Sequence, residues 1–170
     1  FFFQADEGIR DSVASRGLGD VYKRQDITPI LKDSSAFKFV VNEISKTIPD
    51  NVDSIIAPES RGFIFASAVC FNLDKELILA RKKGKLPYKT FEVNYELEYG
   101  SDCFQMHIDS LKPGSKVAII DDLLATGGTI SALETLTKNF DSEIKSVSFV
   151  IELLNPVSYT HLTLPTKRIV

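Results

Sequence analysis

The most informative stretch of this sequence reads Val117-Ala118-Ile119-Ile120-Asp121-Asp122-Leu123-Leu124-Ala125-Thr126-Gly127-Gly128-Thr129. Its first four residues are apolar and mostly β-branched, which is typical of a buried strand. A small, glycine-rich turn follows the two acids, and residues 127–139 then have the pattern of a helix. Because parallel α/β sheets are built from such strand–turn–helix units, the stretch predicts an α/β fold.

The turn after this strand predicts an anion site. Ala125, Thr126, Gly127, Gly128 and Thr129 would present successive backbone N–H groups with no bulky side chain in the way. The helix N-terminus adds positive potential, and the two threonine hydroxyls can donate further hydrogen bonds. Ligands of open α/β sheets bind outside the carboxyl ends of the strands, where this turn must lie. We therefore expect it to bind a phosphate group.

The acid pair narrows the choice of ligand. Asp121 and Asp122 would repel a bare phosphate, but they suit a ligand that also carries vicinal hydroxyls or a nearby Mg²⁺. Phosphate, ribose diol and metal together describe 5-phosphoribosyl-1-pyrophosphate (PRPP). The alternative is that the acids only cap the next helix. Neither GxxxxGK[ST] nor GxGxxG is present, so the sequence lacks the P-loop and dinucleotide fingerprints.

The rest of the chain extends the α/β pattern. A helix capped by Asp33 or Ser34 is expected to run through Thr47, and Phe91–Tyr99 with Cys103–His107 could form a hairpin or a flap around Gly100. The other predicted elements are strands at 54–57, 76–81 and 146–151, a helix at 61–71 and a loop at 82–90. We expect one domain with a central, mostly parallel sheet flanked by helices, and a flap loop.

Composition bounds the class of protein. At 170 residues, with 44% hydrophobic and 25% charged residues, the chain suits one globular domain. Its net charge of −3 gives no hint of a nucleic-acid or anionic-membrane partner. No apolar run approaches the roughly 20 residues of a spanning helix. Cys70 and Cys103 lack metal or CxxC spacing, so we expect free thiols in a reducing compartment, the cytoplasm.

The two ends have an unusual explanation. Asp20–Gln25 can be encoded by GAT GTG TAT AAG AGA CAG, and the reverse complement, read in a shifted frame, encodes Val157–His161. This short DNA word corresponds to the transposon end used in sequencing libraries. We therefore expect residues 1–25 and 156–170 to be translated adapter, flanking a domain at 26–155 that is truncated at both ends.

A family resemblance joins these observations. The segment Val117–Thr129 matches the PRPP signature of type I phosphoribosyltransferases, in the form typical of the adenine enzymes. Four further blocks resemble that family in the same order, and the similarity covers 26–155. They are Asp26-Ile27-Thr28-Pro29-Ile30-Leu31-Lys32-Asp33, Glu59-Ser60-Arg61-Gly62-Phe63-Ile64-Phe65, Arg81-Lys82-Lys83-Gly84-Lys85-Leu86-Pro87 and Tyr95-Glu96-Leu97-Glu98-Tyr99-Gly100.

The resemblance implies a pentosyltransferase of purine salvage that converts adenine and PRPP to AMP and pyrophosphate. It implies Mg²⁺ carried by PRPP, with at most a water bridge to Asp121 or Asp122, and a homodimer. Asp121 and Asp122 would hold the ribose diol, while residues 125–129 would grip the 5′-phosphate. The residues implied for pyrophosphate are Ser60, Arg61, Gly62, Arg81, Lys82 and Lys85.

The resemblance also assigns the remaining roles. Glu98 would assist the base nitrogen, Tyr99 would shield the site from water, and Leu153 would pack against the base. Each segment has a plainer reading as well: Arg61 as a surface residue at a helix start, the basic run as a solvated loop, and residues 95–100 as an ordinary strand. The base hood is incomplete, because Arg24-Gln25 stands where the family has a Phe-Arg pair.

Other functions share parts of this pattern. Xanthine- or orotate-type transferases would have the same PRPP loop, but the block at 95–100 speaks against both. A non-catalytic regulator that senses PRPP or purines could use the same fold. Such a regulator could lose Glu98 or the basic loop, and both are present here.

Overall fold

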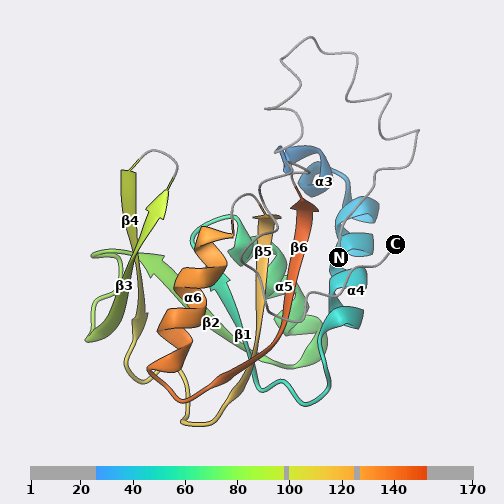
Figure 1. The fold of residues 1–170 in the computed structure, drawn as a ribbon. Helices are drawn as coiled ribbons and strands as arrows, with labels where there is room; N and C mark the ends of the chain where they lie inside the picture. Colours follow the sequence, from blue (N-terminus) through green and yellow to red (C-terminus); the bar gives the residue numbers. More distant parts are fainter. Residues whose placement is uncertain (1–25, 98–99, 125–126, 153–170) are drawn as a thin grey trace.

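The computed structural model describes residues 26–97, 100–124 and 127–152. Within them, six strands form one sheet in the order β3-β4-β2-β1-β5-β6 (Figure 1). The strands are β1 Ser54–Pro58, β2 Glu76–Lys82, β3 Thr90–Leu97, β4 Gly100–His107, β5 Lys116–Leu124 and β6 Glu143–Glu152. The four strands β2-β1-β5-β6 are parallel, whereas β4 runs antiparallel to β2 and β3. The predicted mostly parallel sheet is confirmed.

Helices cover both faces of this sheet. The described helices are α3 Thr28–Lys32, α4 Ser34–Thr47, α5 Gly62–Leu73 and α6 Gly128–Lys138. Helices α4 and α5 lie on one face and α6 lies on the other (Figure 1). Alternate residues of a strand point to opposite faces, so Ala118 and Ile120 join the core under α4 and α5, while Val117 and Ile119 join the core under α6.

The local signals around α4 are confirmed. The Asp33 carboxylate accepts hydrogen bonds from the backbone N–H groups of Ser35 (2.8 Å) and Ala36 (3.0 Å), as an N-cap should. The apolar stripe along the helix is buried at Val40, Val41 and Ile44. The short helix α3 before it was not predicted. No described helix is long and apolar enough to cross a membrane.

Strand β5 is longer than the predicted strand at 117–120. It continues through Leu124, because Asp121, Leu123 and Leu124 pair with Phe149, Ile151 and Glu152 of β6. The acid pair therefore lies in the last part of β5, where the strand pairs with β6, beyond the residues of β5 that pair with β1. The apolar pattern stops at Ile120, but backbone pairing can continue through polar residues near the end of a strand.

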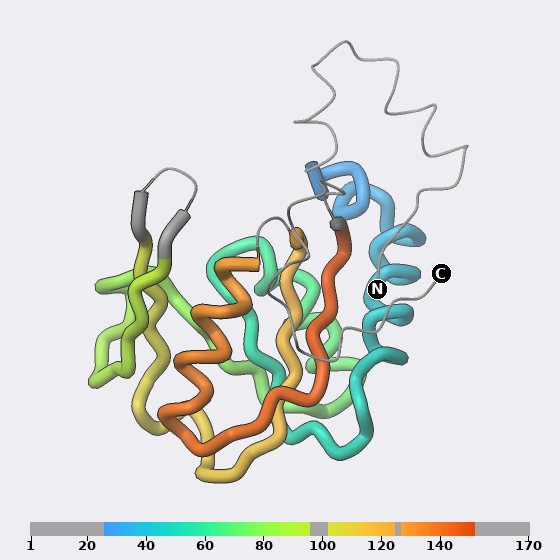
Figure 2. The backbone as a smooth tube through the Cα atoms, viewed as in Figure 1, coloured from blue at the N-terminus to red at the C-terminus, as the bar shows by residue number. Residues whose placement is uncertain are grey.

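The predicted hairpin is confirmed as β3 and β4, which pair in register from Thr90↔His107 to Leu97↔Gly100. Figure 2 shows β3 and β4 at one end of the sheet, next to β2, with the hairpin rising on the same side as the carboxyl ends of β5 and β6. The hairpin thus forms a wall beside the edge where ligands of α/β sheets bind.

Candidate active site

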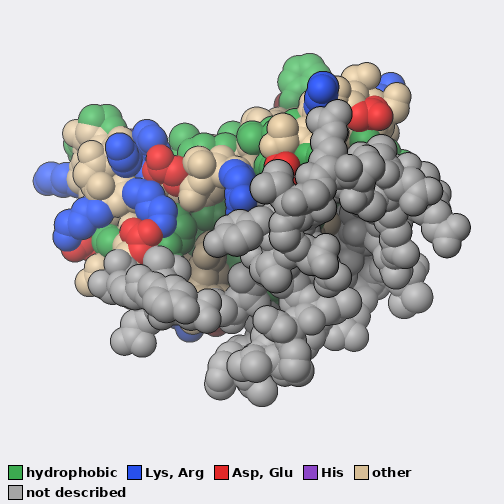
Figure 3. All heavy atoms as spheres, turned by 90° about the horizontal axis from the view of Figure 1, so that it is seen from above, with side chains coloured by type: hydrophobic (Ala, Val, Ile, Leu, Met, Phe, Trp, Pro, Cys, Tyr) green, Lys and Arg blue, Asp and Glu red, His purple; other side chains and the backbone are tan. Residues whose placement is uncertain are grey.

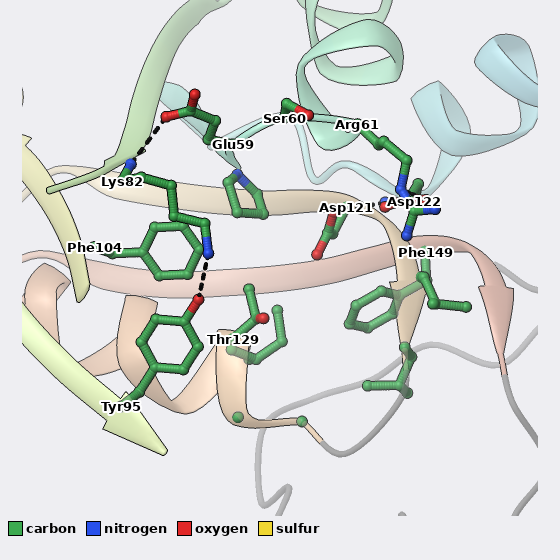
Figure 4. Close-up of a pocket in the computed structure, with 16 residues that line it drawn as sticks. Glu59, Ser60, Arg61, Lys82, Tyr95, Phe104, Asp121, Asp122, Thr129 and Phe149 are labelled. Carbon is green, nitrogen blue, oxygen red and sulfur yellow. Dashed lines mark hydrogen bonds and ion pairs between the residues drawn. The ribbon is translucent and has the colours of Figure 1, made fainter. Parts of the chain in front are cut away.

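A cavity of about 420 Å³ lies at the carboxyl edge of the sheet (Figure 4). Its walls come from the turn after β1, the end of β2, the hairpin, the end of β5 and the start of α6. The lining residues are Pro58, Glu59, Ser60, Arg61, Lys82, Tyr95, Phe104, Asp121, Asp122, Leu123, Leu124, Gly127, Gly128, Thr129, Ile130 and Phe149. Predicted site residues from four separate segments are therefore brought together.

The acid pair forms the floor of this cavity. Asp121 is 9% exposed and Asp122 is 3% exposed, and the Asp122 N–H donates to Asp121 Oδ1 at 2.8 Å. Burial, and then the neighbouring charge of Asp122, raise the pKa of Asp121. Burial also raises the pKa of Asp122, against the opposing effect of Arg61. Two carboxylates in this state favour a ligand that brings hydroxyl donors or a cation.

Arg61 lies across the cavity from the hairpin. Its Nε is 2.8 Å from Asp122 Oδ2, so the guanidinium offsets part of the negative charge of the floor. The turn that carries Arg61 is anchored to β2, because the Glu59 N–H donates to the Ala80 carbonyl at 2.8 Å. The peptide bond between Glu59 and Ser60 is cis. Because Arg61 lines the cavity and also pairs with Asp122, it can contact a bound anion and the acid pair together.

Lys82 supplies a second cation, from the end of β2. Its Nζ forms an ion pair with Asp102 and a hydrogen bond of 3.1 Å with the Tyr95 hydroxyl. The ammonium also lies 5.1 Å from the ring centroid of Phe104. Burial acts to lower the pKa of Lys82, but the hydrogen bonds to Asp102 and Tyr95 outweigh it and raise the pKa. Lys82 is thus held charged at the cavity wall.

The glycine-rich turn completes the cavity at the start of α6. Gly127 has φ +81°, in the left-handed region that glycine adopts without steric cost, and α6 begins at Gly128. Gly127, Gly128 and Thr129 all line the cavity. Their backbone groups and the helix N-terminus suit a phosphate, as the sequence predicts.

Comparisons with known proteins agree with this geometry. The phosphoribosyl transferase domain matches residues 28–161 of the chain. This chain belongs to the phosphoribosyltransferase family. Adenine phosphoribosyltransferase of Caldicellulosiruptor bescii is 50% identical over 129 residues, which are 75% of this chain and 74% of that protein. The enzyme of the same name from Methanococcus maripaludis is 49% identical over 130 residues, 76% of each chain.

Solved structures of adenine phosphoribosyltransferases share the fold. The Thermoanaerobacter pseudethanolicus structure superposes with a TM-score of 0.72 at 42% identity, covering 75% of this chain and 74% of the other. The Saccharomyces cerevisiae structure, in complex with an imino-altritol bisphosphate and adenine, gives a TM-score of 0.75 at 32% identity over 84% of each chain. The predicted fold class is therefore confirmed as that of a type I phosphoribosyltransferase.

Gly62 of this phosphoribosyltransferase packs closely against the acid pair. It does not line the cavity; instead, a Cβ at this position would lie 3.0 Å from both Asp121 Oδ1 and the Ile120 carbonyl, and 3.2 Å from Pro58 Cδ. Helix α5 can therefore begin directly against the end of β5 only because residue 62 has no side chain.

We expect Gly62→Ala to displace the Asp121 carboxylate by a few tenths of an ångström. Misplacement on this scale should lower kcat/KM for PRPP about tenfold or more, because the reaction depends on exact positioning. Steady-state kinetics would measure the effect, with Thr135→Ala on the exposed face of α6 as the control. Unchanged kinetics in Gly62→Ala would show that the close approach has no bearing on the site.

Arg81 and Lys85 do not line the cavity. The Arg81 guanidinium donates to both carboxylate oxygens of Glu59, at 3.3 and 3.2 Å, and to the Lys85 carbonyl at 3.3 Å. Glu59 also accepts from the Lys82 N–H at 2.9 Å, so one carboxylate connects the turn after β1 to the basic segment. Arg81, through its hydrogen bonds, lowers the pKa of Glu59. Contact of Arg81 and Lys85 with pyrophosphate stays a prediction.

Positive charge gathers on this side of the molecule. Seen from above, Lys and Arg side chains cluster around β2 and the hairpin, beside the acids of the same region (Figure 3).

Five of the predicted site residues lie outside the described residues: Glu98, Tyr99, Ala125, Thr126 and Leu153.

Four residues in or beside the cavity were missed from the sequence. Glu59, Tyr95 and Phe104 line it, and the rings of Tyr95 and Phe104 stack at 4.9 Å between centroids. Asp102 does not line the cavity but pairs with Lys82, which does. Tyr95 falls within a family-like block and could have been suspected. Asp102 is 20 residues from Lys82, and only the pairing of β4 with β2 brings it close.

Proposed function

We propose that this chain transfers the 5-phosphoribosyl group of PRPP to adenine, giving AMP and pyrophosphate. The observation that carries the proposal is the meeting of two buried carboxylates, Asp121 and Asp122, with a glycine-rich helix N-terminus and Arg61 in one cavity. Adenine as the acceptor is supported by the relatives that bear that enzyme name, at up to 50% identity over three quarters of the chain.

The reaction asks the protein for position and charge stabilisation. As the bond from the anomeric carbon to pyrophosphate breaks, that carbon develops oxocarbenium character and bonds to the base nitrogen. Asp121 and Asp122 accept hydrogen bonds from the ribose hydroxyls, and Gly127, Gly128 and Thr129 hold the 5′-phosphate. No protein nucleophile is required, because fixing two reactants in line lowers the barrier by itself.

The leaving group lies toward the cations in this proposal. Ser60 and Arg61 bind pyrophosphate oxygens from the turn after β1, and Lys82 binds them from the end of β2. Arg81 and Lys85 extend the basic segment, and Gly62 sets the start of α5. Glu98 assists the base nitrogen, Tyr99 shields the site, Ala125 and Thr126 complete the phosphate turn, and Leu153 packs on the base.

Magnesium fits the donor set only indirectly. The described residues contain no group of three His, Cys, Asp or Glu side chains that could hold a metal, but Asp121 and Asp122 offer two adjacent carboxylates whose raised pKa values a cation would oppose. Mg²⁺ held by PRPP, and bridged by water to Asp121 or Asp122, would neutralise charge on the leaving group. We expect chelation of the metal to weaken PRPP binding at least tenfold.

Calorimetric titration of PRPP into the chain, with Mg²⁺ and then with EDTA, tests the site. Saturable binding that needs the metal supports the proposal; no binding by a folded chain would overturn it. Formation of AMP from adenine, but no nucleotide from xanthine or orotate, separates this enzyme from related transferases. Binding without turnover, by a chain whose hood has been completed with a relative's N-terminal segment, would instead favour a PRPP-sensing regulator.

We also propose that the protein is a cytoplasmic homodimer. A groove lined by residues of α4 and α5 supports the dimer, since its lining includes Phe37, Ile64 and Phe71, and Phe71 is 90% exposed. Sedimentation equilibrium would test it.

The proposed domain at 26–155, with adapter-derived flanks, is tested by the source DNA: an uninterrupted gene with unrelated codons through Val157–His161 would overturn it.

A further inference from the structure

Lys82 reaches the cavity already paired with an anion of the protein itself. Its Nζ forms an ion pair with Asp102 on β4 and a hydrogen bond with the Tyr95 hydroxyl on β3. Lys82 and Tyr95 line the cavity, whereas Asp102 does not. The lysine side chain is 36% exposed and the aspartate side chain 29% exposed, so the pair is partly shielded from solvent. Asp102 therefore cancels part of the charge that Lys82 shows to a ligand.

We propose that Asp102 limits the affinity of the cavity for pyrophosphate by holding the ammonium group of Lys82 in an ion pair. The proposal rests on the proposed function, in which Lys82 binds the leaving group. An ammonium has three N–H donors, and Asp102 and Tyr95 engage two of them. An anion in the cavity is then attracted by a lysine whose charge is already partly neutralised, and it is repelled by the carboxylate beside it.

The expected change in pyrophosphate affinity follows from two opposing contributions of Asp102. Pyrophosphate carries several negative charges, so its repulsion from one carboxylate counts several times over. Against this, Asp102 restrains the lysine side chain, and the rotamer entropy of one lysine limits that opposing effect to roughly a factor of 10–30. Tyr95 restrains the same ammonium without any charge, so most of the ordering survives if Asp102 is neutralised. Removing the charge should therefore tighten binding.

The consequence concerns product release. A site that holds a polyanion with Arg61, Lys82 and Mg²⁺ risks binding its product too tightly to turn over, and product release limits many enzymes. A built-in counterion lowers the affinity for free pyrophosphate without removing the cation that the departing group needs. Asp102 acts through Lys82 and is a positioning residue in this sense.

Binding of inorganic pyrophosphate with Mg²⁺, measured by calorimetry, tests the inference. We expect Asp102→Asn to bind about 5- to 20-fold more tightly than the unsubstituted chain, with a gain that shrinks between low and high salt. Asp102→Glu should return the affinity to within about threefold, and Tyr95→Phe should change it less than about threefold. Lys82→Met should weaken binding at least about tenfold.

A matched control separates the local effect from net charge. Glu43→Gln changes the net charge equally, but Glu43 lies on α4, pairs with Lys46 and does not line the cavity. The Glu43→Gln variant should therefore bind pyrophosphate with unchanged affinity. Equal or weaker binding by a folded Asp102→Asn protein would overturn the inference, as would unaltered binding in Lys82→Met. If the unsubstituted chain does not bind PRPP or pyrophosphate at all, the proposed function itself fails, and thermal melting of each variant shows that it is folded.

Discussion

Asp121→Asn/Asp122→Asn is expected to lower kcat/KM for PRPP by at least about 10³-fold. Both carboxylates are buried at the cavity floor, and an amide accepts hydrogen bonds with less charge and presents N–H donors toward hydroxyl hydrogens. The amides also remove the negative charge that faces the developing oxocarbenium ion. Steady-state kinetics and PRPP calorimetry on the two proteins would measure the loss. Turnover like that of the unsubstituted chain would refute the assignment of the acid pair.

The same double variant should be more stable without ligand at neutral pH. Because burial and mutual repulsion raise the pKa of Asp121, and burial raises that of Asp122, the folded chain binds more protons than the unfolded chain between the ordinary aspartate pKa and the raised values. Stability of the unsubstituted protein therefore falls as pH rises through that window. The amides do not titrate, so the variant escapes this loss, a common exchange of stability for function.

Thermal melting from pH 5 to pH 8 checks the sign. We expect the double variant to gain about 1–2 kcal/mol over the unsubstituted chain at pH 8, with a smaller gap at pH 5. Asp50→Asn, at an exposed turn, is the control for a simple loss of negative charge. A stability difference between the double variant and the unsubstituted chain that stays the same from pH 5 to pH 8 would show that the two carboxylates titrate as ordinary surface groups.

Much of the fold could be predicted because its signals are local. The apolar run at 117–120 marks β5, the Asp33 cap marks the start of α4, and the alternation of strands with helices indicates a parallel sheet. The extension of β5 to Leu124 could not be predicted, since it depends on pairing with β6, whose partner residues lie about 28 positions further along the chain. Helix α3 is too short to leave a periodic pattern.

The site follows the same division. Carboxyl ends of parallel strands meet at one edge, so Arg61 after β1 and Asp121 in β5 could be expected to converge. Contacts that depend on side-chain packing could not. Gly62 looked suited to a ligand, yet its missing Cβ makes room for Asp121, and Arg81 looked free for pyrophosphate but holds Glu59. The cis peptide bond between Glu59 and Ser60 could not be predicted, because cis bonds are expected only before proline.

Arg61→Met is expected to lower kcat/KM for PRPP by about 10²- to 10³-fold. The substitution removes a guanidinium that lines the cavity and that lies 2.8 Å from Asp122 Oδ2. The leaving group loses a charged donor, and Asp122 loses the nearest positive charge. Because Arg61 acts to lower the pKa of Asp122, its removal should raise that pKa further. A protonated Asp122 would lack negative charge and would accept hydrogen bonds from the ribose hydroxyls less strongly.

The pH profile separates these two effects of Arg61. If the guanidinium also keeps Asp122 ionised, the acid limb of kcat/KM should move to higher pH in Arg61→Met, so that raising the pH recovers part of the lost activity. Arg61→Lys keeps the charge without the fork of donors, and it should leave the acid limb near its original place while still losing rate. An equal loss at every pH in Arg61→Met would confine Arg61 to the leaving group. Retention of full activity by Arg61→Met would exclude it from the site, and the charge of Asp122 would then need another source of compensation in the liganded state.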